Sequence, residues 1–365
     1  MATMMRLNAQ EVLSRHDKAL TKKEDFRSLY DEAYEFALPQ RNLYDGYYDG
    51  GVQGTKKMNR VFDSTAINST QRFANRMQSG IFPPQRKWCR LEPGSDIPQE
   101  RKAEAQAALD LYNDKLFDTL KQSNFDVAIG EFLLDLSVGT AVMMIQPGDD
   151  INPINFIPVP QFLVSFEEGA HGQVDNVYRR MRLKGEVIKR QWSDAKVPPE
   201  MQNMIDQKPT EELEFVEATI FDQTRGDYCY HVIEKKSKTE IVYRRMDNSP
   251  WIVSRYAKIA GETYGRGPLI TALPDIKTLN KTLELVLKNA SLSISGVYTA
   301  ADDGVLNPNT VRIMPGAIIP VARNGGPQGE SLKPLPRAGD FNVSQIVMDD
   351  LRKNIKRILL DESLP

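Results

Sequence analysis

Cysteine and histidine are scarce in this chain of 365 residues, which has two cysteines and three histidines. Cys89 and Cys229 lie far apart in the sequence, which excludes a disulfide framework and favours a reducing compartment. No apolar run approaches the ~20 residues that a membrane-spanning helix needs, and the N-terminal residues contain no apolar signal core. The sequence therefore predicts a soluble protein, made in the cytoplasm, with no membrane segment and no cleaved secretion signal.

The chain also lacks a strong excess of either charge. Its 47 Lys and Arg residues stand against 49 Asp and Glu residues, which gives a formal net charge of −2. Any contact with nucleic acid must therefore come from a local basic patch, or be weak.

No recognisable phosphate-binding motif is present. The segment Gly51–Lys56 lacks the spacing of a GxxxxGK[ST] loop. Gly265-Arg266-Gly267-Pro268 is two glycines short of a dinucleotide-binding fingerprint, and Pro268 lacks the N–H that a phosphate cradle uses. We therefore expect no nucleotide cofactor.

Residues that serve in hydrolases and metal sites are not grouped either. His16, His171 and His231 belong to different predicted elements, and no His, Cys and carboxylate spacing resembles a metal site. The pairs Asp149-Asp150 and Asp302-Asp303 stand among Gly, Pro or Asn, so we expect both in solvated turns. His231 is expected to be a packed or surface histidine. The sequence thus nominates no catalytic, cofactor or metal site.

Apolar residues at helical spacing dominate the first part of the chain. They predict helices over 7–38, 64–79, 100–122 and 125–137, with Pro39 ending the first and Gly80 placed to end the second. A short strand is expected from Lys87 to Leu91.

The apolar period changes to two over residues 140–256, which predicts short strands. The strand candidates are 141–146, 162–166, 176–182, 214–222, 228–236, 241–245 and 251–256, interrupted by one short helix at about 184–194. Their close spacing favours antiparallel hairpins over βαβ units, so the predicted fold class is α+β.

The last hundred residues carry the most distinctive pattern, two amphipathic helices that flank a β-rich insert. One apolar stripe comprises Leu269, Leu273, Ile276, Leu279, Leu283, Val286, Leu287 and Ala290, and the other comprises Val343, Ile346, Val347, Leu351, Ile355, Ile358 and Leu359. Pro, Gly and short apolar runs lie between them. This pattern predicts a projecting helical hairpin with a β-rich tip, whose stripes neighbouring copies of the chain would cover.

Two groups of cations allow alternative interpretations. One group interleaves the aromatic residues Tyr44, Tyr47 and Tyr48 with the cations Arg41, Lys56, Lys57 and Arg60. Such a mixture is typical of proteins that bind single-stranded nucleic acid. The alternative is an ordered surface loop or a loop that contacts another subunit. The other group lies opposite the apolar stripe of the last predicted helix and comprises Arg352, Lys353, Lys356 and Arg357. It is either a solvated helix face or a surface that lines a channel or contacts nucleic acid.

Several stretches have a recognisable order and spacing over nearly the whole chain. They are Ser64–Ala66 through Gln78–Leu91, Ser123–Phe125 through Leu136–Ala141, Gly172–Arg180, and Tyr264–Pro268 followed by Ala272–Asn280. In these stretches the chain resembles the portal proteins, or head-to-tail connectors, of short-tailed double-stranded DNA bacteriophages.

The resemblance implies a division of the chain and a role. It places a helical and antiparallel-β wing at 1–265, stem helices at 266–294 and 342–360, a β-rich clip at 295–341, and the start of a tunnel loop at 361–365. Portal subunits form a ring, usually of twelve, at a capsid vertex. The ring docks the packaging terminase, contacts major capsid and scaffold proteins, joins tail adaptor proteins, and passes double-stranded DNA. Portals have no catalytic residues or cofactor of their own. The resemblance thus implies a virion protein that is assembled in the host cytoplasm.

The resemblance also suggests which residues do this work. Candidate channel- or DNA-facing residues are Lys277, Lys281, Lys288, Lys353, Lys356 and Arg357. Candidate subunit-packing residues of the stem are Leu273, Ile276, Leu283, Leu287, Val347, Leu351 and Ile355. Candidate clip residues are Val297, Tyr298, Ile313, Ile318 and Ile319. Because acids such as Asp275 and Glu284 alternate with the cations of 266–294, we expect weak, salt-sensitive contact with DNA.

Portal relatives continue past the second stem helix into a wing helix, a crown and often a helical barrel. This chain stops at Pro365, so we expect the crown and barrel to be absent and the chain to be truncated relative to that family. The alternatives are another phage head-tail structural or adaptor protein, an α+β enzyme acting on nucleic acid with no recognisable motif, or a remnant that does not assemble.

Overall fold

The computed structural model describes residues 6–41, 60–149, 151–295, 298–300, 332–334 and 341–362. Its α-helices are α1 (Ala9–Ala37), α2 (Thr65–Ile81), α3 (Lys102–Gln122), α4 (Phe125–Val138), α5 (Ile188–Gln191), α6 (Pro199–Gln207), α7 (Pro268–Ser295) and α8 (Phe341–Ile358). Its strands are β1 (Thr140–Pro147), β2 (Ile154–Val159), β3 (Val164–Glu168), β4 (Val174–Lys184), β5 (Glu212–Asp222), β6 (Asp227–Glu234), β7 (Thr239–Met246), β8 (Trp251–Arg255), β9 (Tyr298–Ala300) and β10 (Leu332–Pro334). Helices and antiparallel sheets together confirm the predicted α+β class.

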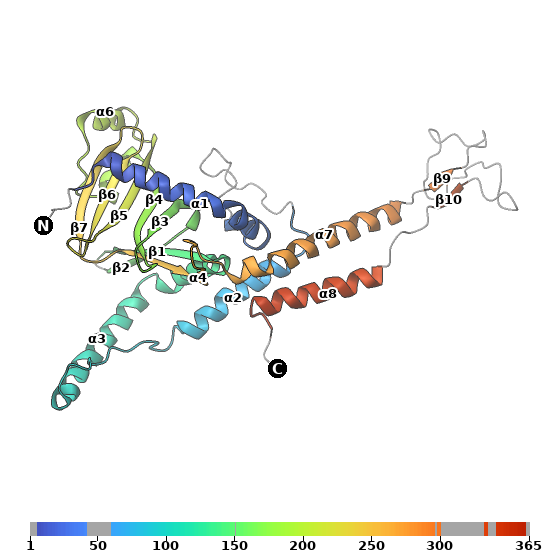
Figure 1. The fold of residues 1–365 in the computed structure, drawn as a ribbon, viewed down its shortest axis with the longest axis horizontal. Helices are drawn as coiled ribbons and strands as arrows, with labels where there is room; N and C mark the ends of the chain where they lie inside the picture. Colours follow the sequence, from blue (N-terminus) through green and yellow to red (C-terminus); the bar gives the residue numbers. More distant parts are fainter. Residues whose placement is uncertain are drawn as a thin grey trace.

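The largest sheet has five strands in the order β3-β4-β5-β6-β7, and every neighbouring pair is antiparallel. α1 lies across one face of this sheet (Figure 1). The helix begins with a capping box, in which the Asn8 side chain accepts the N–H of Glu11 and the Glu11 carboxylate accepts the N–H of Asn8. Val12, Leu13 and Ala19 of α1 then pack on the sheet, so the apolar stripe of α1 has its cover inside the chain.

A second sheet of three strands, in the order β2-β1-β8, carries α4 and α2 on one side. α4 passes directly into β1 through Gly139, where the chain meets the segment that leads into α7. The Gly267 N–H donates to the Val138 carbonyl at 2.8 Å. A Cβ at Gly267 would lie 2.1 Å from the Ser137 carbonyl oxygen, so only glycine fits there. This backbone contact explains the Gly265–Pro268 motif as a packing feature.

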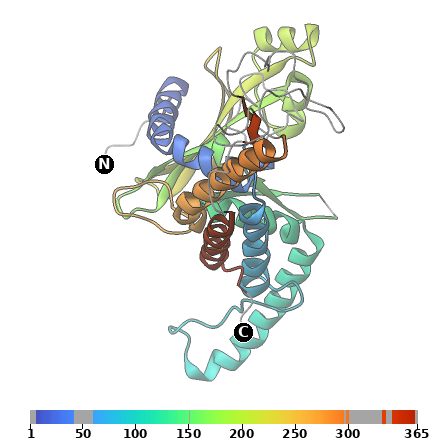
Figure 2. The ribbon, with the colours of Figure 1, turned by 90° about the vertical axis from the view of Figure 1, so that its right-hand side faces the viewer.

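α7 and α8 form a two-helix hairpin that extends away from the sheets (Figures 1 and 2). The base of α7 packs against α1 and α4, and α8 packs against α7 and α2. β9 and β10 pair antiparallel beyond the far end of the hairpin. α3 projects separately, on the other side of the body.

The structure corrects some local predictions. No strand forms at Lys87 to Leu91. That segment instead lies along α3, where Arg90 pairs with Asp110 at 2.9 Å and the Leu91 N–H donates to the Asn113 side chain at 3.1 Å. β2 and α6 were not predicted, and the helix predicted at about 184–194 is the four-residue α5 preceded by a 3-10 turn.

Among the described residues, no helix is both long enough and apolar enough to cross a membrane.

Candidate functional site at the α7–α8 hairpin

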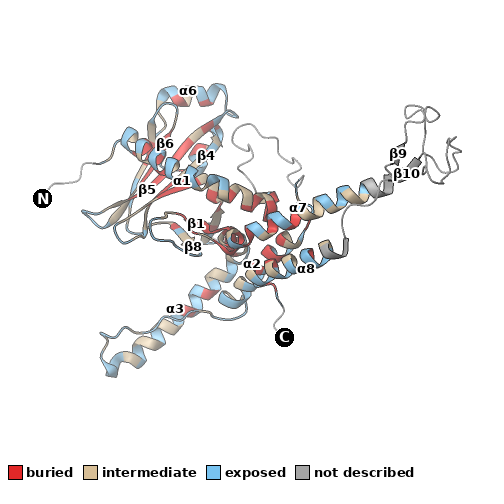
Figure 3. Cartoon of the chain, turned by 45° about the vertical axis from the view of Figure 1, so that its right-hand side comes forward, coloured by how far each residue is buried: buried red, intermediate tan, exposed pale blue. Residues whose placement is uncertain are grey.

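Burial changes along the hairpin from base to tip (Figure 3). Near the base, Leu269, Leu279 and Leu359 are buried in the main core of the chain. Farther out, large apolar side chains are open to solvent: Leu285 and Leu287 of α7 are 53% and 51% exposed, and Ile346 of α8 is 69% exposed. Such exposed large apolar residues are candidates for contact with another protein surface.

The predicted subunit-packing residues therefore divide into separate groups. Leu273, Ile276 and Ile355 are buried within the chain's own core, so the prediction that they face another copy is wrong. The physical reason is that α7 and α8 turn their stripes toward each other and toward α1 and α2. Leu283 and Leu351 are half-buried against that core.

Leu287 and Val347 remain available to a second copy, with exposed fractions of 51% and 45%.

The hairpin joins the rest of the chain through a polar junction just before α2. Asn280 of α7 is buried, and its side-chain oxygen accepts the N–H groups of Phe62 and Asp63 at 2.8 and 3.1 Å. The Asn280 amide donates in turn to the Ile276 carbonyl at 2.9 Å. This one side chain thus fixes the segment that leads into α2 against α7.

Asp63 also holds α8. It is 7% exposed, and the Arg352 guanidinium donates to its carboxylate through two nitrogens, at 2.8 and 2.9 Å. The other carboxylate oxygen accepts the N–H of Thr65 at 2.8 Å, at the start of α2. Burial alone would raise the pKa of Asp63, but the hydrogen bonds from Thr65 and Arg352 outweigh it and lower the pKa below its ordinary value. Asp63 is therefore an ionised clamp between α2 and α8.

A second buried carboxylate lies just past the C-terminal end of α8. Asp361 accepts the hydroxyl of Ser69 at 2.8 Å and the guanidinium of Arg72 at 3.0 Å, both from α2. Arg76 of α2 donates to the Glu362 carbonyl at 2.8 Å. Asp63 and Asp361 together fix α8 along α2 at two separated points.

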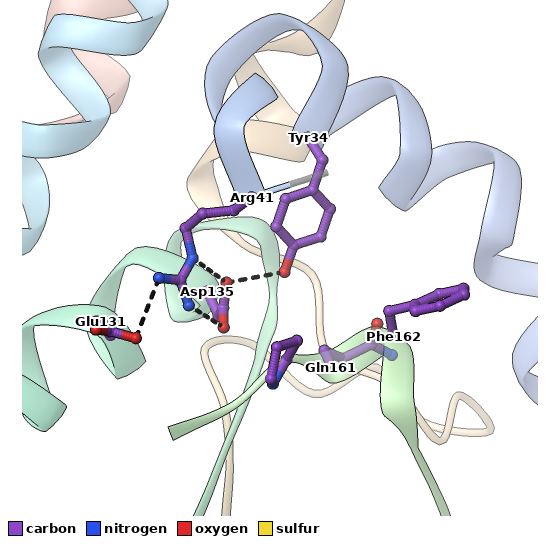
Figure 4. A pocket seen from close by; sticks show the side chains of 7 residues that line it. Tyr34, Arg41, Glu131, Asp135, Gln161 and Phe162 are labelled. Carbon is purple, nitrogen blue, oxygen red and sulfur yellow. Dashed lines mark hydrogen bonds and ion pairs between the residues drawn. The ribbon is translucent and has the colours of Figure 1, made fainter. Parts of the chain in front are cut away.

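A small pocket of about 160 Å³ lies where α1 ends, between Tyr34, Arg41, Glu131, Asp135 and neighbouring residues of the 160–162 turn (Figure 4). Arg41 contacts the buried Asp135 through two nitrogens, at 3.2 and 3.0 Å, and Tyr34 donates to the same carboxylate at 3.1 Å. Burial lowers the pKa of Arg41, but the facing carboxylate outweighs that effect and raises it. The charges of the pocket are therefore satisfied from within the chain.

The predicted aromatic and cationic loop begins beside this pocket. Arg41 is paired with Asp135, and Arg60 pairs with Glu35 of α1 at 3.1 Å. Tyr44, Tyr47, Tyr48, Lys56 and Lys57 lie outside the described residues.

The candidate DNA-facing cations of α7 have partners in the chain. Lys277 pairs with Glu32 of α1 at 2.9 Å, and Lys281 and Lys288 pair with Glu284 at 3.1 and 2.5 Å. Each cation is thus neutralised in part by a neighbouring acid.

The candidate DNA-facing cations of α8, unlike those of α7, are not paired with acids in the described part of the chain. Lys353, Lys356 and Arg357 are exposed and have no ion-pair partner among the described residues. They are the uncompensated positive charges of the hairpin.

The candidate clip residues cannot be placed in the same way. Val297, Ile313, Ile318 and Ile319 lie outside the described residues, and for Tyr298 only its position in β9 is described.

The family model for the bacteriophage head to tail connecting protein matches residues 9–364. The chain belongs to this family. The match takes in both sheets, α3 and the whole α7–α8 hairpin.

Curated relatives are similar to this chain at low identity. The probable portal protein of Bordetella phage BPP-1 is 21% identical over 296 residues, which cover 73% of this chain and 50% of that protein. The portal protein of Enterobacteria phage T3 is 21% identical over 299 residues, which cover 77% of this chain and 53% of that protein. The chain thus spans about half the length of the curated relatives it matches.

The chain also resembles a solved structure of the neck of an empty gene transfer agent particle, with a TM-score of 0.37 and 13% sequence identity. The matched residues cover 86% of this chain and 70% of the chain in that structure.

The junction residues Asp63, Asn280 and Asp361 were not predicted from the sequence. A polar residue within an apolar stripe, as Asn280 is between Ile276 and Leu283, was the available signal. Asp63 and Asp361 carry no comparable pattern, because their partners Arg352 and Ser69 are 289 and 292 residues away in the chain.

Proposed function

We propose that this chain is a structural portal subunit that forms a ring channel at the capsid vertex. The match of the family model over residues 9–364 carries this proposal. The portal names of the relatives from phages BPP-1 and T3 support it. A projecting hairpin with exposed apolar side chains near its tip is the kind of element that a ring of copies would bury.

Within such a ring we assign residues 1–265 to the wing, 266–294 and 342–360 to the stem, and 295–341 to the clip. The clamps at Asp63 and Asp361 would hold the stem at a fixed angle to the wing in every copy. Uniform geometry is needed because a closed ring repeats one heterologous contact around its axis.

The proposed role is passive. The subunit would dock the terminase large subunit, contact major capsid, scaffold and tail adaptor proteins, and let double-stranded DNA pass in and out without catalysing a reaction. Assembly would take place in the host cytoplasm. The ring number proposed is twelve.

The mass of the purified chain in solution tests the ring. We expect light scattering to give a mass near that of a dodecamer, and negative-stain images to show rings with a central hole. A monomer at all concentrations and ionic strengths in which the chain stays folded would contradict the proposal.

Contact with DNA is proposed for the exposed cations of α8. Reversing Lys353, Lys356 and Arg357 to glutamate should leave the ring intact and weaken its retention of double-stranded DNA, with a reduced slope of log affinity against log salt. The comparison variant reverses Lys281 and Lys288, whose two charges Glu284 compensates in part. If the α8 variant packages and ejects DNA like the wild type, the α8 cations are not the contact.

A further inference from the structure

The N-terminal half of α1, residues 9–25, is held to the five-stranded sheet by few apolar contacts. Five of its side chains are buried, and only Val12, Leu13 and Ala19 of these are apolar. The other two are the bases His16 and Lys23, which are 1% and 3% exposed. Because a charged group loses its hydration when it is buried, burial favours the neutral form of each base. This half of the helix is therefore sensitive to protonation.

His16 lies between α1 and β4 with little to stabilise its charged form. Its ring meets the ring of Tyr178 edge-on, with centroids 6.0 Å apart. Its Nδ1 lies 3.0 Å from a carboxylate oxygen of Asp17, whose side chain is 68% exposed, so water screens that pair. Burial lowers the pKa of His16, and Arg180 and Lys235 lower it further, which together outweigh the opposing effect of Asp17. His16 is therefore neutral at neutral pH while α1 is closed.

The sheet presents mainly positive charge to His16. Arg180 of β4 has no ion-pair partner among the described residues, and Arg182 is the next side chain on the same face of that strand. Lys235, just past β6, pairs with Glu214 of β5 at 2.9 Å. A proton on His16 therefore faces the uncompensated charge of Arg180.

The carboxylate of the nearest edge strand already has partners. Glu167 of β3 accepts hydrogen bonds from Arg15 of α1 and from Asn176, both at 2.8 Å. Among the described residues, Asp17 is the one carboxylate within ion-pair distance of His16. The closed helix thus offers an imidazolium only one exposed counter-charge.

Lys23 is the second buried base, two turns farther along the same face of α1. Its Nζ donates to the Phe162 carbonyl. That Nζ and the guanidinium carbon of Arg180 lie 5.3 and 5.6 Å from the centroid of the same Phe162 ring. Burial lowers the pKa of Lys23 well below its ordinary value, and Arg180 adds to that effect. The neighbouring Glu24 is paired with Arg27 at 3.1 Å. Arg180 thus opposes positive charge on both buried bases.

The C-terminal half of α1 is anchored to other elements. Tyr30 is buried, donates to the Gly265 carbonyl and lies 3.2 Å from the Thr140 hydroxyl at the start of β1. Glu32 pairs with Lys277 of α7 at 2.9 Å. The first half of the helix can therefore detach from the sheet while the second half stays in place.

We propose that residues 9–25 form a proton-sensitive cover over the five-stranded sheet, closed while His16 is neutral and open when His16 is protonated. In the open state the imidazolium is hydrated and is no longer held against Arg180. A hydrated histidine takes up its proton near pH 6.5, so the open state binds more protons and is favoured as the pH falls from about 7 to 5. Ordinary carboxylates titrate below that range. Opening uncovers Val216 and Ala218 of the sheet, and it does not depend on the proposed portal role.

Native-state amide exchange of the folded full chain tests the cover at about pH 7, 6 and 5. After correction for intrinsic rates, the opening constant of residues 9–25 should rise about tenfold over that range, since one proton changes it by at most about tenfold per pH unit. Amides of residues 26–37 and of β5 should keep their protection. His16→Gln cannot take up the proton and should remove the rise. His171→Gln, at an exposed residue, is the matched control and should keep it.

The imidazole of His16 can also be titrated directly by NMR, which needs no variant and stands even if His16→Gln does not fold. Its ring signals in the wild-type chain should titrate below the ordinary histidine pKa of about 6.5, and Arg180→Gln should move that titration upward. The proposal is overturned if residues 9–25 exchange equally at pH 7 and 5, or if His16→Gln keeps the full rise. It is also overturned if His16 titrates at or above its ordinary value, or if the whole chain loses protection together, which would be global acid unfolding.

Discussion

The clamp between α2 and α8 predicts a large effect of one substitution, Asp63→Ala. The change removes the acceptor of two hydrogen bonds from Arg352 and one from the Thr65 N–H. Because Asp63 is 7% exposed, little water can replace the lost carboxylate. The base of α8 should then separate from α2 while the sheets stay folded.

The magnitude follows from the two interactions that are lost. Breaking a buried ion pair by removing one partner costs about 3–5 kcal/mol, and water access to the Arg352 side chain, which is 32% exposed, reduces this to about 2 kcal/mol. Loss of an acceptor at a helix start costs about 1 kcal/mol more. A total of about 3 kcal/mol corresponds to about a hundredfold change in an opening equilibrium.

Native-state amide exchange of α8 measures that opening directly, since exchange in this regime reports local free energies. We expect exchange of α8 amides to be about a hundredfold faster in Asp63→Ala than in the wild type. Asp350→Asn is the control, because Asp350 is exposed on the same helix and has no ion-pair partner among the described residues. An Asp63→Ala chain whose α8 exchanges like the control would refute the clamp.

The pH dependence gives an independent check of the same clamp. The folded pKa of Asp63 is lower than its unfolded value, so its stabilising effect is present at neutral pH and is lost as the pH falls through the folded pKa. After correction for intrinsic rates, α8 of the wild type should lose protection as the pH falls below about 4. Asp63→Asn should lack that component.

Other predictions concern packing and assembly. Gly267→Ala should destabilise the chain by about 2–4 kcal/mol in urea unfolding, because its Cβ would meet the Ser137 carbonyl oxygen; unchanged stability would show that this contact can relax. Leu287→Ser with Val347→Ser should change urea unfolding of the isolated chain by less than about 0.5 kcal/mol, since both side chains are about half exposed, yet prevent ring formation in light scattering. Rings formed by that double variant would remove the hairpin tip from the proposed subunit contact.

Local patterns were enough to predict most elements of this fold. Spacings of three and four residues indicated helices such as α4 and α7, and a spacing of two indicated the strands of both sheets except β2, because these periods follow from backbone geometry alone. The same local information predicted a strand at Lys87 to Leu91. Side chains of α3 override it there, since Asp110 and Asn113 bind Arg90 and the Leu91 N–H.

The sequence by itself determined the α+β class, the helical hairpin and the stretches by which the chain resembles its family. Only the tertiary structure decided which part of each stripe is covered: Ile276 and Ile355 are buried within the chain, and Leu287 is not. It also decided that Asp63 clamps Arg352. The physical reason is that periodicity fixes which side chains share a face, whereas burial and ion pairing depend on residues brought together from distant parts of the chain.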